Sequence, residues 1–131
     1  MIGLLIVAHG TLGESLIECA TYVLGDRPVK LLPLDVRDCS NTTEIVAVAR
    51  AQLAELDTGE GVLVLADVYG ATPCNMLCQL IEPGRVELVA GVNLPMLLKV
   101  LTYRHEPLPA LIERAMRGGH NGIFHVTDCH A

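Results

Sequence analysis

The chain has 131 residues, with nine Lys and Arg against fifteen Asp and Glu, so its formal net charge is −6 at pH 7. This acidic balance, with no basic run, argues against a nucleic-acid partner. Apolar residues make up 51% of the chain, yet no stretch approaches the roughly 20 apolar residues that cross a bilayer. We therefore expect one domain over residues 1–131, without membrane insertion and located in the cytoplasm.

Short apolar runs with β-branched members alternate with segments of helical periodicity along the chain. The first run, residues 3–8, is continuous and typical of a strand that is covered on both faces of a parallel sheet. In chain order, the expected elements are a strand at 3–8, a helix at 12–24, a strand at 29–34, a helix at 41–57, a strand at 62–66, a short helix at 72–81, a strand at 86–90, helices at 93–103 and 107–118, and a last strand at 122–127.

This alternation predicts an α/β fold. We expect a single doubly wound domain with a mostly parallel sheet of about five strands, helices on both faces, and the last strand as an antiparallel edge. Ligands of such sheets bind outside the carboxyl ends of the strands.

Two strong titratable candidates, His9 and Asp67, come just after apolar strands. If the strands at 3–8 and 62–66 are neighbours, their ends lie about 5 Å apart and the two side chains can meet. A carboxylate bonded to one imidazole nitrogen fixes the tautomer and leaves the other nitrogen as a nucleophile. By contrast, Asp35 and Asp38, after the second strand, fit a solvated loop better than the rim of a site.

The start of the helix at Thr72 predicts an anion site beside the histidine. Free amides, the positive end of the helix dipole and the Thr72 hydroxyl would attract an anion, and Gly70 would let the backbone come close. This favours phosphoryl transfer, which depends mostly on positioning and charge stabilisation. The same residues also fit a turn histidine, a capping aspartate and an ordinary helix start, and spacing alone does not decide between the two interpretations.

Three ordered blocks resemble the mannose-family IIA components of the sugar phosphotransferase system (PTS) over nearly the whole chain. They are the opening strand into His9-Gly10, the segment 61–75 with Asp67-Val-Tyr-Gly70-Ala-Thr72-Pro73-Cys-Asn75, and the segment 89–97 with Gly91-Val-Asn93-Leu-Pro95. The chain departs from some relatives at Val68 and Tyr69, where those proteins carry Thr and Trp.

The resemblance implies that His9 is phosphorylated, at Nε2, with Asp67 holding Nδ1. Gly70, Ala71 and Thr72 would bind the phosphate, while Gly10, Asn75 and Asn93 would support the loops. It implies no cofactor and no metal.

The resemblance also implies the partners. A histidine-phosphorylated phosphocarrier protein would donate to His9, and a IIB component on a separate chain would accept the group. Family members form homodimers in which the last strand joins the partner's sheet, so residues 122–127 are expected to be exchanged.

Three alternatives stay open. The first is a regulatory module that uses the same phosphorylated histidine without a dedicated transporter. The second is the phosphotransferase subunit that feeds dihydroxyacetone kinase. The third is a small tetrapyrrole metal chelatase, since the opening around His9 resembles those enzymes, although the next histidine along the chain is His105.

Overall fold

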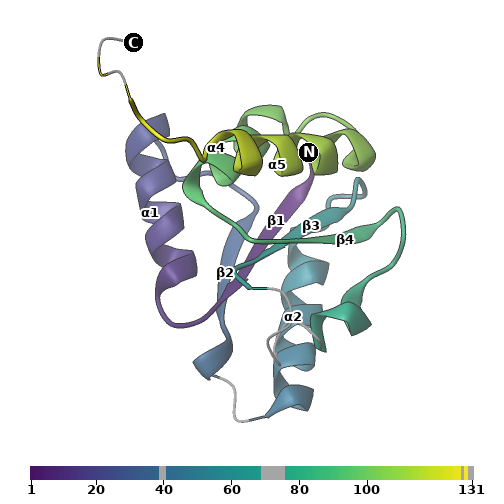
Figure 1. Ribbon diagram of the computed structural model, residues 1–131. Coiled ribbons are helices and arrows are strands. Elements are labelled where there is room, and N and C mark those ends of the chain that lie inside the picture. Colours follow the sequence, from purple (N-terminus) through teal and green to yellow (C-terminus); the bar gives the residue numbers. More distant parts are fainter. Residues whose placement is uncertain (39–40, 69–75, 128, 130–131) are drawn as a thin grey trace.

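The structure is a computed structural model that describes residues 1–38, 41–68, 76–127 and 129. Its centre is a four-stranded, wholly parallel sheet in the order β2-β1-β3-β4 (Figure 1). The strands are β1 (Gly3–Ala8), β2 (Leu31–Asp35), β3 (Val62–Ala66) and β4 (Val86–Ala90). The strand order reverses between β1 and β3, which makes the expected doubly wound α/β topology a confirmed prediction.

Helices cover both faces of the sheet. The helices α1 (Leu12–Leu24), α4 (Leu94–Tyr103) and α5 (Leu108–Asn121) pack on one face, and α2 (Thr42–Leu56) packs on the other (Figure 1). Two short 3₁₀ turns, η1 (Val36–Asp38) and η2 (Cys78–Leu80), follow β2 and precede β4. Among the described residues, no helix combines the length and apolar character that crossing a membrane requires.

The central strand β1 divides the core into two halves because successive side chains of a strand point to opposite faces. Leu4 and Ile6 belong to the cluster beneath α1, α4 and α5, whereas Leu5 and Val7 belong to the cluster beneath α2. Every residue of β1 and β3 is buried. This double coverage explains why both strands are continuous apolar runs in the sequence.

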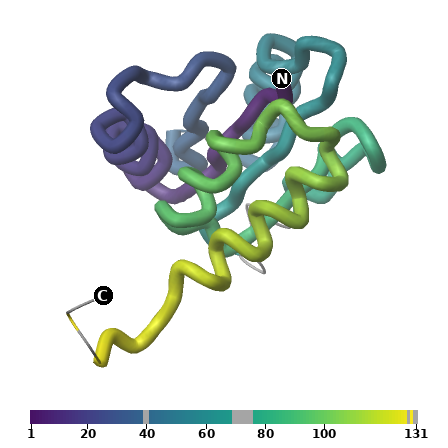
Figure 2. Tube along the Cα trace, turned by 90° about the horizontal axis from the view of Figure 1, so that it is seen from above, coloured from purple at the N-terminus to yellow at the C-terminus, as the bar shows by residue number. Residues whose placement is uncertain are grey.

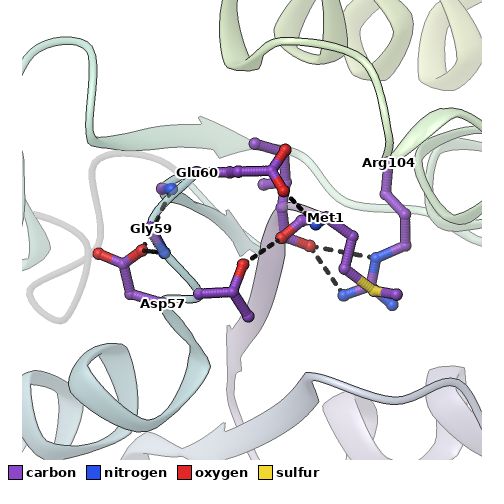
Figure 3. Close-up of polar contacts among 8 residues, drawn as sticks. Met1, Asp57, Gly59, Glu60 and Arg104 are labelled. Carbon is purple, nitrogen blue, oxygen red and sulfur yellow. Dashed lines mark hydrogen bonds and ion pairs between the residues drawn. The ribbon is translucent and has the colours of Figure 1, made fainter.

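The amino-terminal end of the sheet is held by Arg104, which is 4% exposed (Figure 3). Its guanidinium donates hydrogen bonds to the carbonyl oxygen of Ile2, at 2.8 and 3.1 Å, and to those of Val29 and Lys30, at 2.6 and 2.8 Å. Burial lowers the pKa of Arg104 to about 10, which still leaves it charged at neutral pH. Close by, the amino group of Met1 donates to Glu60.

The end predicted for the helix at 107–118 is wrong, because α5 continues through Gly118-Gly119, which has the pattern of a helix stop, to Asn121. The two glycines lie where α5 packs closely on α4. A Cβ atom at Gly118 would come within 2.7 Å of the Lys99 Cβ, and one at Gly119 within 2.7 Å of the Met96 Cε. The absence of side chains serves close helix packing here, rather than a helix stop.

The fifth, antiparallel strand expected at 122–127 is not part of the sheet, whose described strands number four. Residues 123–127 have no regular secondary structure and are exposed. Figure 2 shows why: this segment continues outward from the end of α5 and leaves the body of the molecule, so it reaches neither sheet edge. Of the short helix expected at 72–81, residues 72–75 lie outside the described part, while 76–80 are helical and end in η2.

Candidate functional site

The candidate site lies at the carboxyl ends of the two central strands. Val7 of β1 is in register with Ala66 of β3, so the residues that leave the two strands, His9 and Asp67, emerge side by side. The Asp67 amide donates to the carbonyl oxygen of Val7 at 3.3 Å, which continues the pairing by one residue. The sheet register therefore brings the two predicted residues together.

A single carboxylate oxygen of Asp67 makes two contacts with His9. Asp67 Oδ2 accepts a hydrogen bond from the His9 backbone amide at 3.0 Å and lies 2.9 Å from the ring nitrogen Nδ1. The second oxygen, Oδ1, accepts from the Val68 amide at 2.9 Å. These contacts hold the aspartate side chain and leave its orientation little freedom.

The protonation states follow from this geometry. The side chain of Asp67 is only 13% exposed, and this partial burial acts to raise its pKa. The hydrogen bonds from the His9 ring, the His9 amide and the Val68 amide outweigh burial, so the pKa of Asp67 lies below its ordinary value. Because an ionised carboxylate only accepts hydrogen bonds, Nδ1 must carry the proton. In the neutral ring, Nε2 is then the nitrogen with the free lone pair.

The turn after His9 is fixed by Gly10 and by a residue that the sequence interpretation undervalued, Asp35. Gly10 has φ +67°, a conformation that favours glycine. Its amide donates to Asp35 Oδ1 at 2.9 Å. Asp35 is the last residue of β2 and pairs in register with Ala8, so it belongs to this edge of the sheet rather than to a solvated loop. The usable signal was an acidic residue at the end of an apolar strand that neighbours β1.

Asp35 is itself kept ionised by its surroundings. The amide of Arg37 donates to its Oδ1 at 2.9 Å, and the Arg37 guanidinium lies 3.4 Å from Oδ2. The Arg37 amide is the main cause of a pKa of Asp35 below its ordinary value, and the Arg37 side chain and the Gly10 amide act in the same direction.

The remaining predicted residues fall into two groups. Asn93 accepts from the Met96 amide at 2.9 Å and thereby caps α4, and its Nδ2 donates to the carbonyl oxygen of Gly119 at 3.1 Å. It thus ties the start of α4 to the end of α5. Gly70, Ala71, Thr72 and Asn75 lie outside the described residues.

The arrangement suits attack by an imidazole nitrogen on an electrophile that arrives from solvent. The side chain of His9 is 46% exposed, and Asp67 contacts its ring nitrogen Nδ1. A hollow of about 230 Å³ opens next to the His9-Gly10 turn, between the start of α1 and the end of β2. The site therefore combines an oriented nucleophile with an open approach.

Comparison with known proteins identifies the family of this chain. Residues 3–116 match the family model EIIA-man, described as PTS system fructose IIA component. The chain is 32% identical over 125 residues to the PTS system mannose-specific EIIAB component of Escherichia coli (strain K12); this covers 93% of the chain and 38% of that protein. It is 30% identical over 105 residues to the PTS system fructose-specific EIIA component of Bacillus subtilis (strain 168), covering 79% of the chain and 71% of that protein.

The fold agrees with a solved structure, the mannose/sorbose specific IIA subunit of the phosphotransferase system from Enterococcus faecalis. The TM-score is 0.82 at 22% identity, over 99% of this chain and 98% of that one. The family-model match spans most of the chain. Together with the identity to the two curated relatives, it shows that the sequence, and not only the fold, is that of this family. The chain belongs to the EIIA-man family, the mannose-type IIA components of the phosphotransferase system.

Proposed function

We propose that this chain is a phosphoryl carrier of the sugar PTS, which accepts a phosphoryl group on His9 and passes it on. The observation that carries the proposal is the contact of Asp67 Oδ2 with His9 Nδ1, because in the neutral imidazole it places the proton on Nδ1 and the lone pair on Nε2, in a side chain that is 46% exposed. The donor is a histidine-phosphorylated phosphocarrier protein, and the acceptor is a IIB component. Both proteins work in the cytoplasm in this scheme.

The transfer step needs no redox chemistry. The lone pair of His9 Nε2 attacks the phosphorus atom, so that the Nε2–P bond forms while the P–N bond to the donor histidine breaks. The donor ring, protonated on its other nitrogen, leaves as neutral imidazole. His9 keeps its proton on Nδ1 and becomes positively charged, and the Asp67 carboxylate stabilises that charge.

Anion binding by Gly70, Ala71 and Thr72 is part of the same proposal. The amides and the hydroxyl of this segment would contact the phosphoryl oxygens, as the resemblance implies. Residues 1–131 act as one IIA domain in this scheme.

The relatives favour this role over the alternatives. Both curated relatives are named as components of the PTS, one mannose-specific and one fructose-specific. The chain spans 38% of the length of the mannose-specific protein, which is named as an EIIAB component. Its match to the IIA family model supports a carrier that works together with a IIB component.

The test is phosphate uptake. Incubation with phosphoenolpyruvate, the general first enzyme of the system and the phosphocarrier should add one acid-labile, base-stable phosphate per chain. Mass mapping should place it on His9, and the His9→Ala variant should take up none. Uptake of the label by His9→Ala would show that another residue is the nucleophile.

We also propose a homodimer in which the chain ends are exchanged. Ile123, Phe124 and Val126 are 74%, 73% and 58% exposed, which is costly for three large apolar side chains so close together. Among the described strands, β2 and β4 are the edge strands of the sheet, and a strand edge can accept another strand. Residues 122–127 of one copy would extend the sheet of the other.

A further inference from the structure

The guanidinium group of Arg37 packs against the turn that carries His9. A Cβ atom built on Gly10 would come within 2.9 Å of Arg37 Nη2 and within 3.0 Å of Cζ, and all three of its nearest atoms belong to Arg37. The guanidinium thus fills the space that a side chain at position 10 would need. A positive charge lies directly beside the residue that follows His9.

The backbone of Arg37 is fixed to the same turn. Asp35 Oδ1 accepts from the amides of both Gly10 and Arg37, each at 2.9 Å, so a single oxygen atom fixes the histidine turn and the arginine backbone together. The ion pair between Arg37 Nη2 and Asp35 Oδ2 is longer, at 3.4 Å, and the Arg37 side chain is 64% exposed. Such an exposed, long pair is weak, so the guanidinium can turn towards a stronger anion.

The other eight Lys and Arg residues, all within the described part of the chain, have their contacts elsewhere. Arg27, Arg85, Arg114 and Arg117 pair with carboxylates, three others donate to backbone carbonyls, and Lys99 lies over an aromatic ring.

A cation at this edge would stabilise a phosphoryl group. It brings roughly two negative charges to a place where the carboxylates of Asp67 and Asp35 already lie, in a chain of net charge −6. Arginine is suited to binding a phosphoryl group, because its planar guanidinium can donate two parallel hydrogen bonds to phosphate oxygens.

We propose that Arg37 binds the phosphoryl group during its transfer to and from His9 Nε2. This inference rests on the carrier role proposed above. In the transfer step, as the Nε2–P bond forms and the donor P–N bond breaks, the guanidinium donates to the equatorial oxygens of the phosphoryl group. It releases Asp35 Oδ2 to do so, while the amide contacts of Asp35 hold the turn.

The experiment compares Arg37→Gln and Arg37→Lys with the unchanged chain, and uses Arg117→Gln as a matched control that removes an exposed, paired arginine on α5. Radiolabelled phosphocarrier is the donor, and initial transfer rates are measured over a range of donor concentrations. At saturating donor, Arg37→Gln should be slower by about tenfold or more, because a charge-assisted contact in the transition state is lost. Arg37→Lys should recover part of the rate, and Arg117→Gln should match the unchanged chain.

The outcomes separate the two proposals. No label on the unchanged chain would overturn the carrier role and this inference together. Label on the unchanged chain, but a saturated rate for Arg37→Gln within about twofold of it, would overturn the arginine assignment alone. A rise in KM without a fall in kcat would also overturn it, because Arg37 would then contact only the donor protein. Thermal melts must agree to within about 2 °C, so that a fall in rate is not due to unfolding.

Discussion

Asp67 Oδ2 contacts both the backbone amide of His9, at 3.0 Å, and its ring nitrogen Nδ1, at 2.9 Å. The amide contact places the histidine backbone, and the ring contact sets the rotation and tautomer of the imidazole. The Asp67 side chain therefore sets the position of Nε2 and the tautomer in which Nε2 is the unprotonated nitrogen.

Replacing Asp67 by Asn should slow phosphate uptake by about a hundredfold or more, because an Asn amide can donate to Nδ1 and so move the ring proton to Nε2. The fold should survive, since the change is nearly isosteric. Initial rates of labelling from the phosphocarrier measure the effect, and circular dichroism checks the fold. Full-rate uptake by a folded Asp67→Asn protein would remove Asp67 from the mechanism.

Acid should erase the contribution of Asp67 to stability. Its pKa in the folded chain lies below the ordinary value of 3.8, so the stabilisation is complete above the unfolded pKa and is lost as the pH falls through the folded one. The difference in unfolding free energy between the unchanged chain and Asp67→Asn should shrink as the pH falls from about 5 to about 3. Urea titrations at several pH values measure it, and a difference that grows over this pH range would contradict the assignment.

Replacing Arg104 by Met should lower the unfolding free energy by about 3 kcal/mol or more, because the carbonyl groups of Ile2, Val29 and Lys30 lose a buried donor. Urea denaturation is the measurement. The control Arg117→Met, at an exposed position, should change stability by no more than about 0.5 kcal/mol. Equal effects of the two substitutions would mean that Arg104 does not hold the strand ends.

The adjacent glycines of α5 offer a matched pair. Gly118→Ala should cost about 1–3 kcal/mol of stability, because the new methyl group meets Lys99 Cβ and Cγ, close to the α4 backbone. Gly119→Ala should cost less, because it meets the flexible end of Met96 and gains helix propensity. Thermal unfolding of both variants checks the order, and the reverse order would contradict the packing described for α4 and α5.

Phe124→Asp should convert the proposed dimer to a monomer, because a charge would enter the apolar contact of the exchanged segment. Tyr22→Asp is the control, since Tyr22 is an exposed aromatic residue on α1, at 90% exposure, and should leave the mass unchanged. Size-exclusion chromatography with light scattering gives the masses. A monomeric unchanged chain, or a dimeric Phe124→Asp variant, would refute the exchange.

The sequence was sufficient to predict the four parallel strands and the meeting of His9 with Asp67. Both central strands are covered on two faces, so they appear as unbroken apolar runs, and each run ends at the residue that begins the site. The chain reversal between β1 and β3 then follows from the doubly wound topology. These features depend on local pattern and on a general rule of parallel sheets.

The features that were not predicted depend on contacts between distant segments. Gly118-Gly119 has the local pattern of a helix stop, and only the approach of α4 shows why the helix continues. Residues 122–127 have the composition of a strand, but a strand also needs a neighbour. Asp35 gains its place from its register with Ala8, so the acidic residue at the end of β2 becomes informative only when β2 is placed next to β1.

The complete burial of β1 has a consequence for motion at the site. Backbone amides in a strand that is covered on both faces and flanked by two strands should exchange with deuterated solvent only when the whole domain opens. His9 follows this strand directly, so its backbone is attached to a completely buried part of the sheet. The hydrogen bonds of the His9 and Gly10 amides to Asp67 and Asp35 continue this order into the turn, so little reorganisation energy is needed at each encounter with a partner. Protection from exchange should therefore extend through Gly10 and fall beyond it.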